Sequence, residues 1–387
     1  MLASKGKKNM TKVIGPVSAG KRTPRAFAPR FPSRRFDHVM GTRDGPVYLD
    51  QTLAGRVKEE IDMNRVHTRI RWLGILLCAL AAPAQSYSLT GIHDFRPLVT
   101  GDATLTQQQR DYPALVYEFE GLTFTQDGSL WAAIAADPAG AKREFWKLDL
   151  QNNTAATRIP DPVQYHPQNF LGLANPVGLA SNGNQLIVGE NGHAYGNLIW
   201  AFTPDSGKTY DWYFPLSAAA CDEVEGLAQS GGKLYASCQN DKKILEIADT
   251  QGTVTNSFTF QDQVLGLEET DDGRLIVGTY PSRELLIFDP SGNMPTETIS
   301  LDKLFKGQDS DYYQLTGHEY AVQVVPTENV RTLPDPDALA FRDGKIYMAF
   351  DGDLRIYEIS PAAVPEPETY ALMLAGLALI GLKLARR

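Results

Sequence analysis

Apolar and polar positions alternate through most of residues 115–360, in a unit that recurs along the chain. Each unit begins with Gly-Leu or Ala-Leu, continues into a turn that contains glycine, and resumes with Leu or Ile followed by aromatic or β-branched residues. The units begin at Gly121, Gly178, Gly226, Gly266 and Ala338. Because Asp-Gly and Asn-Gly between alternating apolar residues are strong hairpin signals, each unit is expected to open with two antiparallel strands.

A third strand is predicted in every unit, at residues 145–148, 198–202, 244–247, 285–288 and 354–359. A fourth follows in several units, at residues 210–214, 254–260 and 296–301. Four-stranded units at intervals of 40 to 72 residues are typical of the blades of a β-propeller. We therefore predict an all-β protein with five four-stranded blades, and the 72-residue interval before the last unit leaves room for a sixth.

The two ends of the repeat bear on whether the blades close into a ring. The last unit runs into Pro361 and lacks an outer strand, while residues 115–119 form a predicted strand with no blade ahead of it. Pairing of this N-terminal strand into the last blade would leave no open sheet edge, which favours closure over an open array of hairpins. The long interval is interpreted as an insertion, and loops 303–337 and 189–197 are expected either to contact a ligand or to be simple solvated surface.

The N-terminal region has the order of a secretory signal, but it begins late. Residues 63–84 run from a basic segment through an apolar stretch to Ala82 and Ala84, small residues at −3 and −1 of a cleavage point. Export by the Sec machinery and cleavage after Ala84 are expected. Residues 1–62 carry 13 Lys and Arg against 6 Asp and Glu and show no apolar period. They are interpreted as a disordered or mis-assigned extension before a true start at Met63, or else as a basic interaction tail.

The other end combines a proline-rich box, an apolar run and a basic terminus. The box is Val364-Pro365-Glu366-Pro367, the apolar run covers residues 371–382, and the chain ends in Arg386-Arg387. These residues resemble the PEP-CTERM sorting signal, whose hydrophobic segment is a short helix. The alternative is a plain C-terminal membrane anchor. The resemblance implies a Gram-negative bacterium, transient anchoring in the inner membrane, processing by an exosortase, and a final place at the cell surface or outside it. The family is often associated with extracellular polysaccharide and biofilm matrix.

The charge of the chain excludes one class of partner, and its cysteines predict a disulfide. The chain has a formal net charge of −9, and residues 85–365 carry 18 Lys and Arg against 38 Asp and Glu. Such a surface repels phosphate backbones, so no nucleic-acid partner is expected. Cys221 and Cys238 flank one predicted hairpin. A disulfide between them is expected in an oxidising compartment, the alternative being two separate thiols.

Acidic residues stand at one register of the repeat. The residue before each Gly-Leu or Ala-Leu should lie where an inner strand enters the central channel, and in the five units it is Glu120, Val177, Glu225, Leu265 and Asp337. Three converging carboxylates repel one another unless they bind a cation or take up protons. Hard oxygen ligands suit Ca²⁺ or Mg²⁺, so a metal site at Glu120, Glu225 and Asp337 is one prediction. The other is that these carboxylates only solvate the turns.

This arrangement is similar to that of SMP-30/gluconolactonase and NHL-type propellers. The resemblance to SMP-30/gluconolactonase implies a divalent metal that activates lactone hydrolysis, with Asn175 or Asn240 in the place of the family's asparagine. Two function hypotheses follow. The first is a non-catalytic binding module at the cell surface or in the matrix, which takes a polysaccharide or a surface protein. The alternative is a metal-dependent lactonase or esterase that uses Glu120, Glu225 and Asp337.

Overall fold

The computed structural model describes residues 86–103, 105–111, 117–135, 143–160, 175–193, 196–204, 206, 210–217, 219–248, 250–292, 295–325, 328–330 and 333–362. All of them belong to one compact unit, residues 75–387. The expected N-terminal extension, signal peptide, sorting box and C-terminal hydrophobic helix lie outside the described residues. Among the described helices, none has both the length and the apolar content needed to cross a bilayer.

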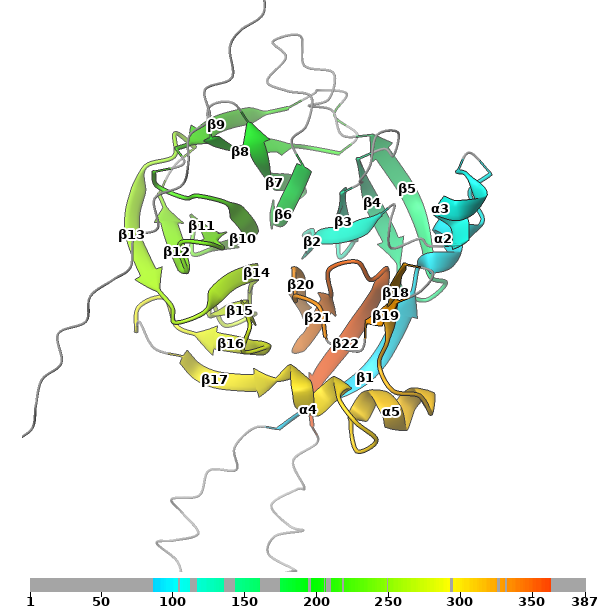
Figure 1. Cartoon of the computed structure of the whole chain (residues 1–387). Helices are drawn as coiled ribbons and strands as arrows, with labels where there is room; N and C mark the ends of the chain where they lie inside the picture. Colours follow the sequence, from blue (N-terminus) through cyan, green and yellow to red (C-terminus); the bar gives the residue numbers. More distant parts are fainter. Residues whose placement is uncertain are drawn as a thin grey trace, which may run out of the picture. The chain divides into compact units, whose positions relative to one another are not determined.

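Five four-stranded antiparallel sheets form a ring around a central axis (Figure 1). Blades I and II consist of β2 (Glu118–Phe124), β3 (Leu130–Ala135), β4 (Glu144–Asp149), β5 (Thr154–Pro160), β6 (Asn175–Asn182), β7 (Gln185–His193), β8 (Gly196–Phe202) and β9 (Trp212–Leu216). Blades III and IV consist of β10 (Val224–Ser230), β11 (Lys233–Cys238), β12 (Lys243–Ile247), β13 (Val254–Thr259), β14 (Gln263–Glu269), β15 (Leu275–Tyr280), β16 (Glu284–Phe288) and β17 (Pro295–Ser300). The predicted five-bladed propeller is confirmed.

Blade V is built from both ends of the described chain. Its strands are, from the axis outward, β20 (Ala338–Arg342), β21 (Lys345–Ala349), β22 (Arg355–Pro361) and β1 (Tyr87–Asp94). Closure by an N-terminal strand is therefore confirmed, but the predicted strand at 115–119 was wrong. Glu118 and Phe119 belong to the inner strand β2 of blade I, and the closing strand is β1, which lies earlier in the chain.

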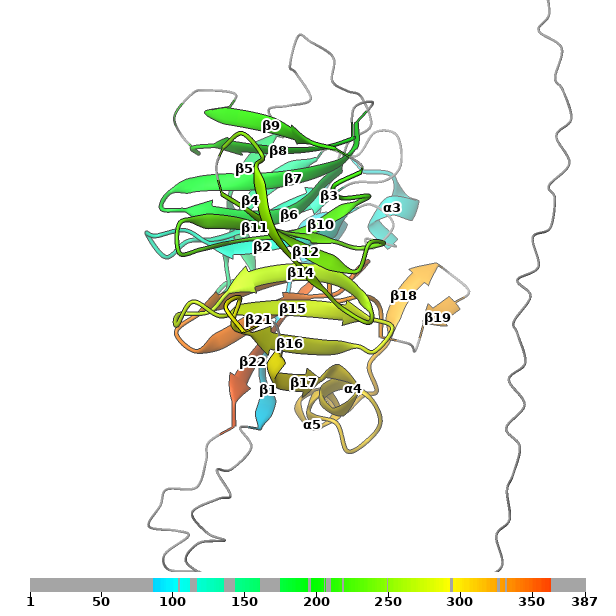
Figure 2. The same cartoon turned by 90° about the vertical axis from the view of Figure 1, so that its left-hand side faces the viewer.

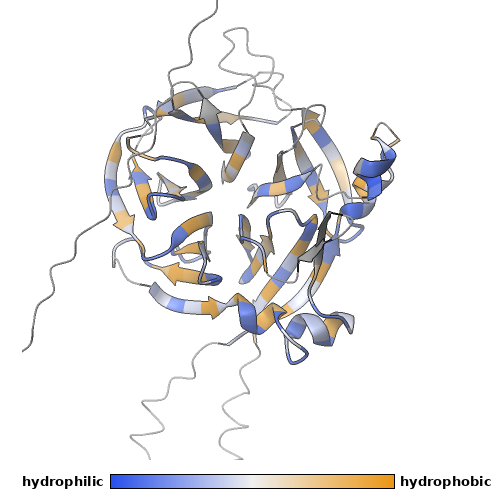
Figure 3. Cartoon of the chain, in the orientation of Figure 1, coloured by the Kyte–Doolittle hydropathy of each residue, from blue (hydrophilic) through white to orange (hydrophobic). Residues whose placement is uncertain are grey.

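The hairpin turns follow the sequence signals. The glycine of each inner hairpin turn has a positive φ, which side chains other than glycine rarely adopt, in all five blades: Gly128, Gly183, Gly232, Gly273 and Gly344. Apolar residues recur along the strands of every blade (Figure 3). They pack between neighbouring blades, as where Trp131 and Phe145 of blade I meet Leu179, Trp200 and Phe202 of blade II. A comparable cluster joins blade V to blade I, so the ring is closed by packing as well as by strand pairing.

Glycines bring the inner strands close together at the axis. A Cβ added at Gly226 would lie 2.5 Å from the carbonyl oxygen of Leu265 and from the nitrogen of Leu267 on the next blade. A Cβ at Gly266 would lie 2.4 Å from the carbonyl oxygen of Asp337. Gly121 and Gly178 contact the backbone of the following blade in the same way. These four residues, the ring glycines, explain why the repeat begins with glycine.

The insertion between blades IV and V is only partly a loop. It contains α4 (Leu301–Phe305), α5 (Asp311–Thr316) and a hairpin of β18 (Val322–Val325) and β19 (Glu328–Val330). Phe305, Tyr312 and Tyr320 are buried in the core cluster of blades IV and V. Loop 303–337 was expected to contact a ligand or to be solvated surface, but these three residues belong to the core, and α4 and α5 hold two of them, Phe305 and Tyr312, against the outer rim of the ring. Two helices lie between β1 and β2, α2 (Arg96–Thr100) and α3 (Gln107–Asp111).

Cys221 and Cys238 form the expected disulfide, with Cα atoms 5.3 Å apart. The bond closes a loop with a sequence separation of 17 and is fully buried between blades II and III. In the loop-entropy model a loop of this length contributes roughly 3 kcal/mol. We expect the double variant Cys221→Ala, Cys238→Ala to lose about that much free energy of unfolding, measured by chemical denaturation. The wild-type protein in the presence of a reducing agent should lose a similar amount of free energy. An unchanged denaturation midpoint in both experiments would contradict the prediction.

Candidate functional site: an acidic channel mouth

The inner strands carry a local irregularity that turns side chains toward the axis. In β2 the pairing with β3 shifts between Phe119 and Gly121, so Glu120 has no partner across the ladder. In β10 the pairing shifts between Val224 and Gly226, which leaves Glu225 in the same position. Bulges of this kind redirect a side chain and are common beside functional sites. In blades I and III the bulge residue is thus the one that precedes the ring glycine, whereas Asp337 precedes β20, whose pairing with β21 shows no shift.

Seven carboxyl groups gather where the inner strands begin. They come from β2, β10 and the segments beside them, and from both sides of the β20–β21 hairpin: Glu118, Glu120, Glu223, Glu225, Asp335, Asp337 and Asp351. We call this set the acidic mouth. The expected residues Glu120, Glu225 and Asp337 do act on one another, since the charges of Glu120 and Glu225 both raise the pKa of Asp337. Sequence reasoning missed the other four.

Burial and mutual repulsion shift the mouth carboxyls far from their ordinary pKa. Burial, with the charge of Glu225 next, raises the pKa of Glu120 to about 8. Burial, followed by the charges of Glu223 and Asp351, raises the pKa of Glu225 to about 8. Burial and the charge of Asp351 raise the pKa of Asp335 to about 6. The mouth therefore holds protons at neutral pH that isolated carboxyl groups would have lost.

Glu118 has a strongly raised pKa. Burial and the charge of Glu120 raise its pKa to about 10, and it is hydrogen-bonded to the carboxyl groups of Asp351 and Glu120. A neutral Glu118 is consistent with these contacts, because a protonated carboxyl can donate to a neighbouring carboxylate. Glu118 and Glu120, two positions apart on β2, are therefore strongly coupled.

Glu225 is a largely buried carboxyl among other negative charges. Glu225 is only 9% exposed, and no hydrogen bond to its carboxyl group is found among the described residues. The charges that act on it come from Glu223, Asp351, Asp335 and Glu118, all negative. A carboxyl held among other negative charges is costly to ionise unless a cation binds beside it.

Amide side chains hold the rim of the mouth in place. Asn240 Nδ2 donates to Glu223 Oε2 at 2.9 Å, and Gln263 Nε2 donates to Asn240 Oδ1 at 3.2 Å, so blades III and IV are joined there. Asn191 Nδ2 donates to the carbonyl of Val224 at 2.7 Å, and its Oδ1 accepts from the Val224 N–H at 2.9 Å. Asn240, one of the two predicted stand-ins for a family asparagine, thus lies beside an acidic mouth residue. The Asn175 side chain lies outside what the structure describes.

The register that carries the acidic residues is apolar in two blades. Val177 and Leu265 take the place of the acidic residue in blades II and IV, and both are buried. The positive charge of Arg283 lowers the pKa of Asp335. No group of three or more His, Cys, Asp or Glu side chains in the described part of the chain is already arranged to hold a metal ion. The expected metal triad therefore shares one mouth but is not preassembled there.

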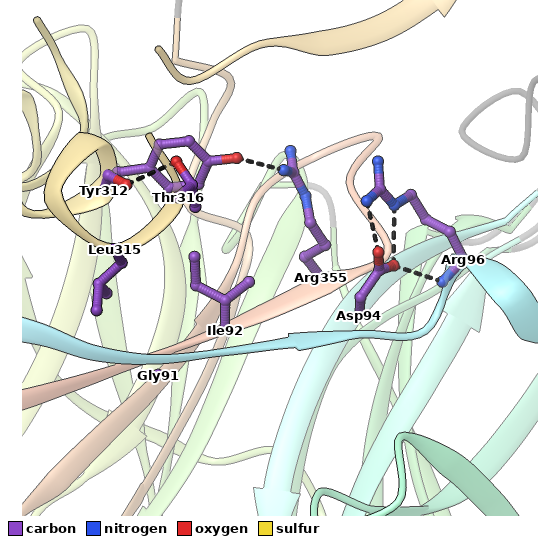
Figure 4. A pocket seen from close by; sticks show the side chains of 8 residues that line it. All are labelled: Gly91, Ile92, Asp94, Arg96, Tyr312, Leu315, Thr316 and Arg355. Carbon is purple, nitrogen blue, oxygen red and sulfur yellow. Dashed lines mark hydrogen bonds and ion pairs between the residues drawn. The ribbon is translucent and has the colours of Figure 1, made fainter. Parts of the chain in front are cut away.

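A hollow lies on the outer rim of blade V, between β1 and α5 (Figure 4). It has a volume of about 350 Å³ and is lined by Ile92, Arg96, Leu315 and Arg355, among others. The Arg355 guanidinium binds Asp353 through Nε and Nη2 and donates from Nη1 to the Tyr312 hydroxyl at 2.7 Å. The buried Arg355 thus braces α5 against β22, and this hollow is a weaker candidate than the mouth because its strongest polar group is already engaged.

Comparison with known proteins identifies the C-terminal segment and the fold. Together, the fold and the mouth define a five-bladed β-propeller with a cluster of carboxyl groups where its inner strands begin. Residues 363–387 match the PEP-CTERM protein-sorting motif. The motif implies export and processing by an exosortase at the surface of a Gram-negative bacterium. No curated protein matches the sequence.

Solved structures similar to this chain include propellers of varied function. A Myxococcus xanthus glutaminyl cyclase is 16% identical, with a TM-score of 0.48 over 71% of this chain and 96% of that one. A luciferin-regenerating enzyme is 12% identical, with a TM-score of 0.37 over 65% and 92%. A catalytically inactive virginiamycin B lyase from Staphylococcus aureus is 14% identical, with a TM-score of 0.35 over 66% and 97%. At these levels the likeness transfers no activity to this chain.

Proposed function

We propose that this protein is an exported, surface-sorted binding module that takes a positively charged group into the acidic mouth. The observation that carries the proposal is Glu225, a nine-tenths buried carboxyl with no described hydrogen-bond donor, surrounded by other carboxyls. A cation placed among these groups would replace the protons that now neutralise them. The ligand chemistry is a divalent cation or an ammonium group, the latter carried by a surface protein or an amino-bearing polysaccharide.

One feature of the mouth favours binding over turnover. The amides of Asn240 and Asn191 fix the rim by hydrogen bonds between blades, which makes the mouth a rigid frame. Pre-organised mouths of this kind reduce the ordering cost of binding.

The second candidate function is the metal-dependent lactonase or esterase. It is favoured by one observation, the raised pKa of Glu120 and Glu225 to about 8, which suits general acid or base catalysis near neutral pH. This candidate requires that a divalent ion enter the mouth first. Hydrolysis of a simple lactone by calcium-loaded protein, lost in Glu120→Gln, would support it.

Calorimetric titration of the full chain tests the proposal with two probes, calcium chloride and methylammonium chloride. We expect saturable binding of at least one probe, weakened about tenfold or more in Glu225→Gln. The affinity should rise from pH 6 to pH 9, because the mouth then loses its competing protons. Parallel titrations in Tris and HEPES should reveal proton release.

Asp309→Asn is the matched control, since it removes one negative charge from the exposed segment between α4 and α5. Binding of calcium but not methylammonium would identify a metal site, and the reverse result an amine site. Absence of saturable binding of both probes across this pH range would overturn the proposed function.

A further inference from the structure

The two ends of the propeller leave it at one point. The N–H of Ala362 donates to the carbonyl of Ser86 at 2.7 Å, so the residues that precede β1 and follow β22 are hydrogen-bonded neighbours. Both views show the start of β1 beside the end of β22 (Figures 1 and 2). The PEP-CTERM motif begins at residue 363, the next residue along the chain. No spacer therefore separates the folded blade from the motif.

The strand that leads into the motif is held mainly by β1. Strand β21 pairs with β22 through Tyr357, Glu358 and Ile359. Strand β1 pairs with β22 over its whole length, from Arg355 through Pro361. Ser360 and Pro361, the last residues of β22, thus pair with Ser88 and Tyr87 of β1. We call this pairing the β1–β22 clasp.

Side chains anchor the clasp to the rest of the ring. Tyr87 Oη donates to Glu297 Oε2 on β17 at 2.7 Å, and the Leu89 N–H donates to Asp311 Oδ2 at the start of α5 at 2.9 Å. Thr90, the bulge residue of β1, is exposed and lies 3.1 Å from Ser360 through their hydroxyl oxygens. The clasp is therefore a fixed edge of the body, continuous with the chain that enters the motif.

The covalent length of the chain limits where the body can be. An extended chain spans at most about 3.6 Å per residue. Pro365 of the sorting box thus lies within about 11 Å of Ala362, and the apolar run that begins at Ala371 within about 32 Å. An enzyme that binds the box at the membrane must accommodate whatever part of the body lies beside Ala362.

We propose that the β1–β22 clasp is the surface that this protein presents to its membrane-bound sorting enzyme. The clasp and the box are one continuous stretch of chain, so the enzyme that engages the box contacts the exposed part of β1 around Thr90. Blade II, on the opposite rim of the ring, faces away from this enzyme. This inference does not depend on what the acidic mouth binds.

Photo-crosslinking in cells that carry an epitope-tagged exosortase tests the proposal. The full chain is made with benzoylphenylalanine in place of Thr90 or, as the matched control, in place of Tyr213. Tyr213 is 42% exposed on β9, the outer strand of blade II, which lies across the ring from the clasp (Figure 1). We expect an adduct with the tagged enzyme from Thr90 at least about fivefold above that from Tyr213, in line with an orientation fixed by a short tether.

A second variant carries a 20-residue Gly-Ser spacer between Ala362 and residue 363. The spacer frees the orientation of the body, so the Thr90 adduct should fall toward the Tyr213 level while the motif itself is unchanged. Equal labelling from Thr90 and Tyr213 without the spacer would overturn the proposal, as would labelling of phospholipid alone or of neither. A Thr90 adduct that survives the spacer at full strength would show a contact that does not depend on the tether, and it would refute the argument from chain length.

Discussion

Replacing Gly226 by alanine should lower the free energy of unfolding by about 3 kcal/mol or more, or prevent folding. The added Cβ would lie 2.5 Å from backbone atoms of Leu265 and Leu267. Real Cβ atoms do not approach so closely, and backbone atoms of a neighbouring inner strand cannot rotate away as a side chain can. The blades would have to separate at the axis, where the inner strands meet.

Denaturant titration of Gly226→Ala, followed by circular dichroism, measures this effect. Gly292→Ala is the control, because the nearest atom to a Cβ there is the Asp289 carbonyl oxygen at an ordinary 3.6 Å. The control should differ from the wild type by less than about 1 kcal/mol. A Gly226→Ala protein as stable as the control would show that the inner strands are not held at the separation described.

The stability of the unliganded protein should fall as the pH rises from about 4.5 to about 8. The folded state keeps protons on Glu120 and Glu225, whose pKa is about 8, whereas these groups ionise near 4.5 in the unfolded chain. Since the folded state then binds more protons than the unfolded state, the free energy of unfolding decreases with pH through that window. The stabilising contribution is complete below about pH 4.5 and is lost above the folded pKa.

Glu225→Gln should remove part of this pH dependence. The amide cannot ionise, so the variant is expected to be more stable than the wild type at pH 9 by on the order of 2 kcal/mol, with little difference at pH 5. Melting temperatures from pH 5 to pH 9 in the presence of a chelator measure both proteins. Asp309→Asn should keep the wild-type slope. A wild-type melting temperature that is flat or rises across this range would refute the assigned protonation.

The repeated units predict the inner hairpins well because their signals are local. A turn glycine and the apolar alternation beside it are enough to place β2 with β3, or β14 with β15. The closing strand carried no such signal. Strand β1 pairs with residues more than 260 positions away, and its sequence contains Gly91 and few β-branched residues. Residues 115–119 have a stronger strand pattern, but their last two residues belong to the first inner strand.

The acidic mouth was only partly predictable, because only some of its residues share a local repeat signal. Glu120, Glu225 and Asp337 share a register in the repeat, so their convergence follows from the propeller symmetry. Glu118, Glu223 and Asp335 lie two residues earlier in the same units and form a second acidic register that is visible in the sequence. Asp351 follows β21 and joins the mouth because its N–H donates to the carbonyl of Asp335, which precedes β20, and no sequence motif predicts this contact.

The contact between Ser86 and Ala362 also means that the propeller does not depend on where its chain begins. A short linker could join these two residues, and a new pair of ends could be opened in the turn at Gly231 and Gly232, where an added Cβ would meet no atom within 4 Å. Such a circular permutant should keep all five blades while carrying its termini on a different blade. The fold and the site of surface attachment are thus separable, and the ring could be displayed from another side without redesign of its core.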